Sequence, residues 1–431
     1  MKLNINKSLK AACILTAFST AIFSCNKSLP VAEPIVPDAP TGSTINELLS
    51  DPNFSILKAA VTRAGTGLTN LLSDKTAVFT FFAPDNNAFM LSGIPSEAAI
   101  AVFRPGQLDT LLKYHLIGGI KIKAADISED IPNMYLQSDF VLAPPSASLP
   151  PGLRMPIFPS RRGSVAWVNN IPVTQADIAA ANGVIHKVAT LVAPPSQVLL
   201  QRIAADPDLT YLFAAVQRAD SGDAAQTLQA ALQNPAANLT VFAPTNLAFQ
   251  TILTGLITQG LIPIITAQTK AAIKQQLIAN GVPEADAETQ ATAAVAAQAA
   301  AIAAGAQAQA AVLASTPGVF TNPLLGSVIT PTLVKGIVVY HLLGSRAFSV
   351  NIPTTATALK TLLNGAIAAH PGITVQATFG LTGVTAATVK GLGNATASNV
   401  LINPTPAPGG TSDQHYINGT LHKIDQVLLP Q

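Results

Sequence analysis

After residue 43 the sequence contains two copies of the same pattern, and this internal duplication constrains the fold more than any other feature. Four segments recur in the same order in the two halves of the sequence. The pairs are DPNFSILKAAVTRAG (51–65) with DPDLTYLFAAVQRAD (206–220), FFAPDNNAF (81–89) with VFAPTNLAF (241–249), RPGQLDTLLKYH (104–115) with TPTLVKGIVVYH (330–341), and NGVIHKVATLVAP (182–194) with NGTLHKIDQVLLP (418–430). The stretch between the second and third segments is much longer in the second copy. We therefore predict two related domains, residues 44–196 and 197–431, with a large insertion in the second.

The repeated segments predict helices and strands in an irregular order. Asp-Pro before an apolar pattern is typical of a helix start, because the Asp side chain caps open N–H groups and proline is tolerated in the first turn. The run VFTFFAP (78–84) is rich in β-branched and aromatic residues and predicts a buried strand. Asn-Gly before each final apolar run indicates a tight turn into a last strand. Because no regular βαβ rhythm appears, the sequence predicts an α+β fold with a mostly antiparallel sheet.

The FAPxNxAF strand and turn, the Tyr-His pair and the terminal NGxxHK strand resemble those of fasciclin-type domains, in order and in both copies. The resemblance covers the chain from Thr44 to Gln431. It implies two tandem domains, each a wedge-shaped β-sandwich flanked by helices and used for adhesion and matrix contacts. It also implies no enzyme activity, no cofactor and no metal.

The first 43 residues predict export and a tether. A basic start is followed by an uncharged, mostly apolar run from Ala11 to Ser24, which is too short to span a membrane and is typical of a signal peptide. The run ends in AIFSC, which resembles a bacterial lipobox, so we predict a signal peptide over 1–24 and a lipidated Cys25. An ordinary signal peptide cut nearby remains the alternative. Residues 25–43 carry regularly spaced prolines and predict a semi-rigid spacer.

Charge and cysteine content exclude several classes of protein. The formal net charge is +2, with no run of basic residues, so the sequence shows no electrostatic footprint for nucleic acid. The two cysteines, Cys13 and Cys25, provide neither a disulfide framework nor a thiolate metal site. If Cys25 is lipidated, the mature chain has no free thiol, as expected of a protein exported from a reducing cytosol.

Two segments depart from the common pattern. Residues 143–163 of the first copy contain six prolines followed by Arg161 and Arg162, and we expect a long exposed loop that forms either a contact surface or a tolerated surface excursion. Residues 264–316 of the second copy are rich in alanine and glutamine and predict a two-helix hairpin, with a stop at Asn280-Gly281 and a new start at Pro283-Glu284. Residues 289–334 carry no charge, so a membrane span is an alternative to a soluble hairpin. Alanine buries little apolar surface and glutamine needs partners in lipid, which favours the soluble hairpin.

Catalytic motifs are absent from the sequence. It has no HExxH, Cys-x-x-Cys, G-x-S-x-G or phosphate-binding glycine loop. Ser412, Asp413 and His415 lie close together, but residues so near in sequence rarely adopt triad geometry. Four of the six histidines fall at matching places in the two copies, where a buried neutral imidazole is expected. We predict no enzyme activity, no metal site and no cofactor.

These observations predict an exported, lipid-anchored protein of the cell envelope, at the outer membrane or cell surface, that acts by binding. Its expected partners are an envelope or extracellular protein or polysaccharide, and the membrane through the lipid. The fasciclin resemblance places adhesion near the Tyr-His pair, which implies Tyr114, His115, Tyr340 and His341 as binding residues, although these positions also suit a role in the core. The alternatives are a glycan or small-ligand receptor, favoured by a concave pocket between the domains, and an assembly scaffold that docks a partner on the alanine-rich hairpin.

Overall fold

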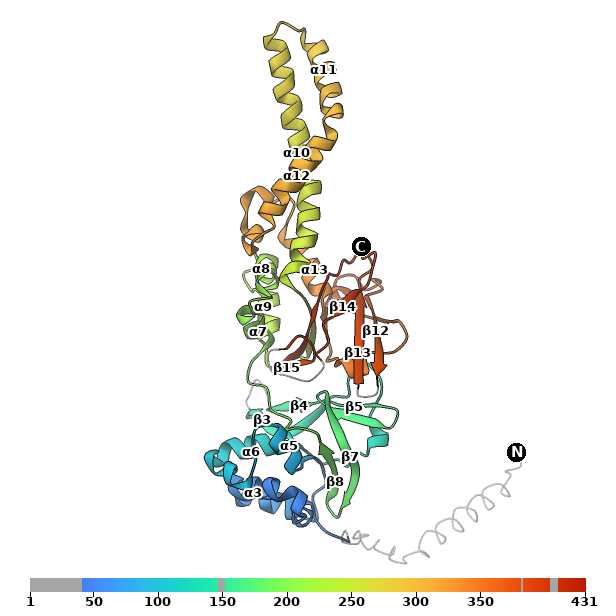
Figure 1. The fold of residues 1–431 in the computed structure, drawn as a ribbon. Coiled ribbons are helices and arrows are strands. Elements are labelled where there is room, and N and C mark those ends of the chain that lie inside the picture. The colour runs from blue at the N-terminus through green and yellow to red at the C-terminus, as the bar shows by residue number, and fades with distance from the viewer. Residues whose placement is uncertain (1–40, 146–151, 381–382, 404–409) are drawn as a thin grey trace, which may run out of the picture. The chain divides into compact units, whose positions relative to one another are not determined.

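The computed structural model describes residues 41–145, 152–380, 383–403 and 410–431 (Figure 1). The predicted signal peptide, Cys25 and the spacer up to residue 40 lie outside the described residues. Residues from Thr41 to Gln431 form one compact unit that contains two β-rich domains flanked by helices. We call residues 44–196 the first repeat and 197–431 the second repeat. The position of the boundary between them stays a prediction.

The first repeat is built around a six-stranded sheet with the order β2-β1-β8-β7-β6-β5, beside a two-stranded sheet of β3 and β4. Its strands are β1 (Phe79–Pro84), β2 (Leu116–Gly118), β3 (Leu136–Ala143), β4 (Leu153–Ile157), β5 (Pro159–Arg162), β6 (Val165–Val168), β7 (Ile171–Ala180) and β8 (Gly183–Val188). Its helices are α2 (Ile45–Leu48), α3 (Ser55–Ala64), α4 (Thr66–Ser73), α5 (Asn86–Leu91) and α6 (Pro105–Tyr114). One apolar cluster fills the space between the helices and the sheet, and a second lies between the strands.

The second repeat reproduces this plan in a sheet with the order β10-β9-β16-β14-β13-β12-β11, in which β15 also pairs with β16. Its strands are β9 (Leu239–Pro244), β10 (Leu342–Leu343), β11 (Thr357–Leu359), β12 (Ile373–Gly380), β13 (Gly383–Lys390), β14 (Ser398–Val400), β15 (Gln414–Tyr416) and β16 (Gly419–Ile424). Its helices are α7 (Leu199–Ala205), α8 (Thr210–Ala219), α9 (Thr227–Gln233), α10 (Asn246–Ala279), α11 (Glu284–Ala297), α12 (Ala299–Leu313) and α13 (Pro331–Tyr340). It too has a helix-side cluster and a strand-side cluster.

The predicted α+β class with a mostly antiparallel sheet is confirmed. Among the described strands, only the pairs β1–β8 and β9–β16 run parallel. The strands β1 and β9 are buried along their whole length, as their apolar sequences predict. Each is followed by a capped helix start, where the Asp85 carboxylate accepts the N–H of Ala88 and the Thr245 hydroxyl accepts that of Ala248.

The matched asparagines after these caps are structural in both repeats. The Asn86 side chain accepts the N–H of Ile56 and donates to the carbonyl of Pro52. Asn246 accepts the N–H of Tyr211 and donates to the carbonyl of Pro207 in the same way. Asn86 therefore fastens the start of α3, and Asn246 the start of α8, to the helix start that follows β1 or β9.

The expectation of a long exposed loop over 143–163 is wrong. The described part of this segment forms β4 and β5, and only residues 146–151 fall outside the description. The prolines suggested a loop because proline cannot donate to a sheet ladder. Here Pro156 lies in β4, whose one strand partner among the described residues is β3, and Pro159 lies in β5 at the end of the six-stranded sheet. Edge strands tolerate proline, because one side of the strand needs no N–H donor.

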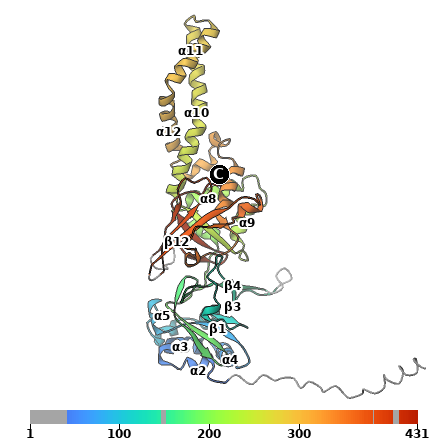
Figure 2. The same ribbon diagram turned by 90° about the vertical axis from the view of Figure 1, so that its right-hand side faces the viewer.

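The predicted helical insertion is present, but it begins earlier than expected. The helix after β9 does not stop after two turns as α5 does, but continues unbroken to Ala279. It then turns at Gly281, whose φ is +86°, and α11 and α12 return along it (Figures 1 and 2). The stop at Asn280-Gly281 and the start at Glu284 are as predicted. We call residues 258–309 of this excursion the arm.

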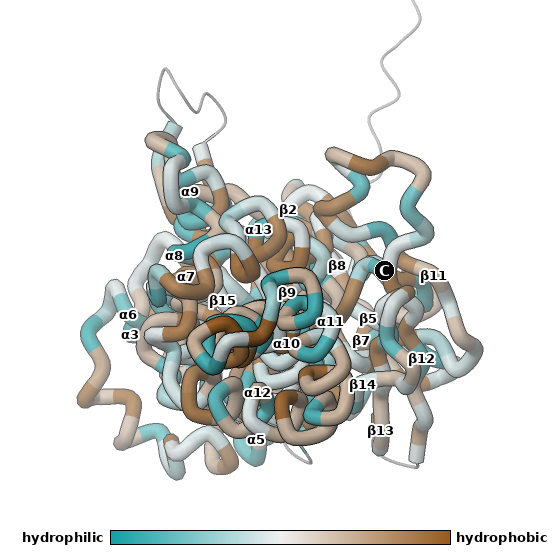
Figure 3. Tube along the Cα trace, turned by 90° about the horizontal axis from the view of Figure 1, so that it is seen from above, coloured by the Kyte–Doolittle hydropathy of each residue, from teal (hydrophilic) through white to brown (hydrophobic). Residues whose placement is uncertain are grey.

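The arm is held by small side chains and by charges near its tip. Ala287, Ala291, Val295, Ile302 and Ala306 are buried along its inner seam. Lys270 pairs with Glu288 at 2.5 Å, and Lys274 pairs with Glu284 at 3.0 Å and with Glu288 at 3.2 Å. Figure 3 looks down the arm from above and shows hydrophobic and hydrophilic segments mixed in its helices.

Among the described residues, α10 is the one helix that is by itself long and apolar enough to cross a membrane, and 22% of its most apolar window is buried. The pair α11 and α12 passes the same test only together, with a bend of 64° between them. The charged pairs lie in the part of α10 that leaves the core of the repeat, where a membrane would have to accommodate them. The preference for a soluble hairpin therefore stays our prediction.

Candidate binding site at the junction of the repeats

The histidine of each Tyr-His pair is a structural bridge. His115 lies at the end of α6, where its Nδ1 is 2.8 Å from the carbonyl of Leu111 and its Nε2 accepts the N–H of Val192 at 2.9 Å. His341 repeats the arrangement with Ile337 at 2.8 Å and Leu428 at 2.8 Å. These contacts require a neutral imidazole with its proton on Nδ1. Burial lowers the pKa of both histidines to about 4, although the carbonyl contact acts in the opposite direction.

The tyrosines of the two pairs are used differently. The Tyr114 hydroxyl accepts from Asn169 at 2.8 Å, donates to the carbonyl of Pro156 at 3.1 Å and lies 3.5 Å from Nδ1 of His415 in the second repeat. Tyr340 instead stays within its own repeat, where it donates to the carbonyl of Gly372 at 2.5 Å. Tyr114 therefore reaches the junction of the repeats, whereas the contacts of Tyr340 are internal.

All four residues of the Tyr-His pairs are buried, with exposed fractions of 0% for Tyr114, His115 and Tyr340 and 1% for His341. They cannot touch a partner without a rearrangement of the core. Their burial and hydrogen bonds favour the structural role that the sequence left open. A direct part in binding stays a prediction.

An apolar cluster joins the two repeats. Phe158 and Trp167 of the first repeat pack against Phe348 and Val350 of the second. The ring of His415 meets Phe158 and Phe348 edge to face, with centroid distances of 5.9 and 5.6 Å. The junction therefore has an aromatic core of its own.

Hydrogen bonds surround this cluster. The Asn133 side chain donates to Asn351 at 2.8 Å and accepts the N–H of Phe348 at 2.8 Å. Arg162 donates to the carbonyls of Val350 and Ile352, at 3.1 and 3.0 Å. Because backbone and side chains of both repeats take part, the junction fixes one relative placement of the strands that meet there.

Arg346 is a buried cation at the junction, with an exposed fraction of 0%. Its guanidinium donates to the side chain of Asn238 at 3.1 Å and to the carbonyl of Tyr416 at 2.9 Å. It also lies 4.5 Å from the ring centroid of Phe158 in the first repeat. No carboxylate among the described residues forms an ion pair with it, and burial lowers the pKa of Arg346 to about 9.

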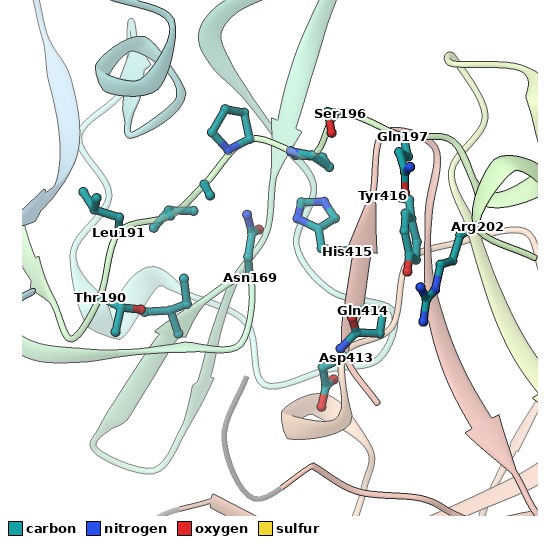
Figure 4. A pocket seen from close by; sticks show the side chains of 15 residues that line it. Asn169, Thr190, Leu191, Ser196, Gln197, Arg202, Asp413, Gln414, His415 and Tyr416 are labelled. Carbon is teal, nitrogen blue, oxygen red and sulfur yellow. The ribbon is translucent and has the colours of Figure 1, made fainter. Parts of the chain in front are cut away.

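A cavity of about 430 Å³ opens beside this junction (Figure 4). It is lined by the β6–β7 turn at Asn169, by the connecting segment 190–197, by Arg202 of α7 and by residues 413–416 at β15. Both repeats and the segment between them thus contribute to its wall. Its volume lies within the range of small-molecule sites.

The wall of the cavity is fixed by the elements described above. His115 holds the N–H of Val192, and the N–H of Ile417 donates to the carbonyl of Gln197 at 2.9 Å, so the connecting segment is fastened near both ends. Asn169 sits in a two-residue turn with φ values of +46° at Asn169 and +67° at Asn170, as type I′ hairpins require. The buried Tyr114 and His115 therefore support the cavity from behind.

Sequence reasoning missed a second matched pair of residues. Asp177 and Asp413 have positive φ values of 63° and 52°. The N–H of each donates to Nδ1 of a buried histidine at 3.2 Å, His186 in the first repeat and His422 in the second. The aligned sequences ADIAAA (176–181) and SDQHYI (412–417) share only this aspartate, so only its place before the Asn-Gly turn could have revealed it.

The cluster of Ser412, Asp413 and His415 does not form a triad. The Asp413 carboxylate accepts from the N–H and the hydroxyl of Ser349, both at 2.6 Å. His415 faces Tyr114 and the aromatic cluster, and burial together with the Arg346 guanidinium lowers its pKa well below the usual value. A charge relay needs the carboxylate on the imidazole, and here the carboxylate is used elsewhere. Within the described parts of the chain, no three His, Cys, Asp or Glu side chains gather where they could hold a metal ion.

Comparison with known proteins agrees with this architecture. The family model of the fasciclin domain matches residues 52–194. Transforming growth factor-beta-induced protein ig-h3 of Sus scrofa is 32% identical over 157 residues, which are 36% of this chain and 20% of that protein. The chain therefore spans only about a fifth of the length of this relative and of its Oryctolagus cuniculus counterpart, which is 29% identical.

Protein sll1483 of Synechocystis sp. is 34% identical over 167 residues, which cover 37% of this chain and 80% of that protein. A solved FAS1 domain pair from the insect cell adhesion molecule fasciclin I aligns with 87% of this chain and 96% of its own, at 14% identity and a TM-score of 0.30. A score this low supports no conclusion about the placement of the repeats. The extent of the Synechocystis match, together with the fasciclin model over the first repeat, shows that the chain belongs to the fasciclin domain family, whose members are typically extracellular adhesion and binding modules.

Proposed function

We propose that this protein is a non-enzymatic binding protein of the cell envelope, in which two fasciclin-type modules act as one adhesive unit. The observation that carries the proposal is the junction itself. Its aromatic core and the buried Arg346 hold the modules together. A fixed pair presents one continuous surface to a protein or polysaccharide partner, and binding by a rigid surface loses less conformational entropy than binding by two independent domains.

The experiment is an attachment assay with the full chain on beads. Beads coated with the wild-type protein are washed over surfaces carrying extracellular matrix protein or envelope polysaccharide, beside albumin-coated beads. We expect wild-type and Lys121→Ala beads to attach equally, because Lys121 is exposed and lies outside the junction. Arg346→Ala beads should attach less. Attachment no better than that of albumin on every surface would contradict the proposal.

Lipid anchoring through Cys25 belongs to the same proposal. It is supported by the AIFSC sequence at the end of the apolar run and by the proline-rich spacer that follows. Radiolabelled palmitate should enter the wild-type protein but not a Cys25→Ala variant. Equal labelling of the two proteins would contradict lipid attachment at Cys25. Protease treatment of intact cells should then release the repeats if the protein faces outward.

A receptor for a soluble ligand or glycan is the second candidate. The cavity of about 430 Å³ at the junction favours it, because a flat junction would offer a small ligand no enclosure. An assembly scaffold is the third, with the arm as the docking element. The arm is supported as a separate element by its absence from the first repeat, where α5 ends at Leu91.

A further inference from the structure

We propose that the junction cavity binds a neutral saccharide unit. The inference rests on the receptor role suggested above and names the chemistry of its ligand. Three properties of the cavity carry it, namely polar groups on the wall without a partner among the described residues, the absence of an unpaired cation among the charged side chains that line it, and apolar side chains beside the polar groups.

The polar groups come from the connecting segment. The hydroxyls of Thr190 and Ser196 and the side-chain amide of Gln197 line the cavity, and none of the three hydrogen-bonds to another described residue (Figure 4). Hydroxyls and amides both donate and accept hydrogen bonds. A saccharide hydroxyl has the same double capacity, so these groups suit a ligand with several hydroxyls.

The charged groups at the cavity already have partners. Arg202 pairs with Asp206 at 2.8 Å, and Asp206 also pairs with Lys423 at 2.9 Å. The Asp413 carboxylate is occupied by its two hydrogen bonds from Ser349. A uronate or sulfate group would lose its hydration without gaining an unpaired cation, which disfavours a charged sugar.

Apolar side chains also contribute to the wall. Ile171, Val192, Ala193 and Pro194 line the same cavity, and of these the more exposed Ala193 and Pro194 offer surface to the C–H faces of a sugar ring. The segment that carries Val192, Ala193 and Pro194 is fastened by His115 at Val192 and by Ile417 at Gln197. A wall that is already in place loses little entropy when a ligand binds, so a weakly interacting neutral ligand can still be held.

The test uses saturation-transfer NMR on the full chain with a panel of neutral disaccharides, namely maltose, cellobiose, lactose, chitobiose and xylobiose, beside digalacturonate. We expect transfer to at least one neutral disaccharide and a weaker signal or none for digalacturonate. The signal should be lost in Ala193→Trp, which fills the cavity, and kept in Ala285→Trp, which places the same side chain on the exposed tip of the arm.

A second pair of variants measures one hydrogen bond. Gln197→Ala should weaken the binding of that disaccharide roughly three- to ten-fold, as expected for the loss of one hydrogen bond, whereas Gln268→Ala on the arm should not change it. Trp167 fluorescence verifies that the junction is intact in the two glutamine variants, and far-ultraviolet circular dichroism and the melting midpoint verify the fold of the two variants that add a tryptophan. No transfer to any neutral disaccharide, unchanged binding in Ala193→Trp, or transfer to digalacturonate alone would overturn the proposal. Beads that still attach without saccharide binding would contradict this inference but leave the adhesive function standing.

Discussion

Lys121 of the first repeat and Arg346 of the second stand at matching positions but have opposite surroundings. The Thr80 hydroxyl accepts the N–H of Ile122, and the Thr240 hydroxyl accepts that of Ala347, which aligns the residues just before them. Lys121 is exposed, whereas Arg346 is buried against Phe158 of the first repeat. The two copies therefore share the residues that build the fold and differ at the residues through which one copy contacts the other.

The two Tyr-His pairs also combine a shared residue with one that differs between the repeats. His115 and His341 make equivalent bonds, so the histidine belongs to the fold of each repeat. Tyr114 and Tyr340 stand at equivalent places, but only Tyr114 reaches across to His415. Residues that match in sequence can thus be separated into those that build a repeat and those that join the repeats.

The largest expected effect is that of acid on the shared histidines. Their pKa values are lowered to about 4 in the folded chain, so between pH 6.5 and about 4 the unfolded chain binds protons that the folded chain does not. The free energy of unfolding should therefore fall as the pH is lowered, by about 1.4 kcal/mol per pH unit for each histidine. Urea unfolding across this range measures it, and His115→Gln and His341→Gln should each flatten the curve by a similar amount. Variant curves parallel to that of the wild type would contradict the shared role.

Arg346→Ala should have the next largest effect. It leaves the acceptors on Asn238 and Tyr416 unpaired and removes the cation from Phe158, so we expect a loss of about 3–5 kcal/mol in the free energy of unfolding. Lys121→Ala is the matched control and should stay within about 0.5 kcal/mol of the wild type. Equal effects of the two substitutions in urea unfolding would remove the contrast between the repeats.

Tyr114→Phe and Tyr340→Phe separate the two uses of the tyrosine. Each removes a hydroxyl with two hydrogen bonds and should cost about 1–2 kcal/mol in thermal unfolding. Only Tyr114→Phe removes a hydrogen bond from Asn169, whose turn lies next to Trp167, so only this variant should shift the Trp167 emission and weaken bead attachment. If adhesion falls in proportion to stability in both variants alike, neither tyrosine has a role beyond the fold.

The smallest effect is expected from the arm, which the first repeat lacks. Residues 264–294 can be replaced by a short glycine-containing turn, because the ion pairs of Lys270 and Lys274 set the register of the two sides. Phe249, Leu253 and Ile257, which pack in the core of the second repeat, lie outside the replaced segment and are retained. The melting midpoint should be unchanged, and any partner docked by the arm should be lost from co-purification. Unaltered co-purification would sink the scaffold alternative, and loss of the folded repeats would show that the arm is part of the core.

Local patterns predicted the elements that recur. Three such elements are the Asp-Pro helix starts, the buried FAP strands and the stop at Asn280-Gly281. Each depends on residues that are neighbours in the sequence, so the sequence alone is enough to predict it. The insertion was expected to begin at residue 264, just after Pro263, a residue that ordinarily disrupts a helix, but α10 continues through this proline from Asn246 to Ala279. The prolines of β4 and β5 led to the wrong prediction of a loop, because a strand cannot be recognised as an edge strand before its sheet is known.

The junction could not be predicted because it depends on residues far apart in the sequence. Asn133 and Asn351, or Tyr114 and His415, meet only through the placement of the two repeats. Composition gives no sign that Arg346 is buried, since arginine is ordinarily exposed. The Asn-Asn turn at Asn169 was visible between two apolar runs as a hairpin signal, but nothing marked it as the wall of a cavity.

Trp167 tests the central claim most directly, because it is the only tryptophan of the chain and lies in the apolar cluster that joins the repeats. Urea unfolding of the full chain, followed by Trp167 emission and by far-ultraviolet circular dichroism, compares the junction with the repeats themselves. A junction that holds the repeats as one unit predicts that the two transitions coincide in the wild type, and that the Trp167 transition comes first in Arg346→Ala. A red shift of Trp167 before any loss of secondary structure in the wild type would contradict the account.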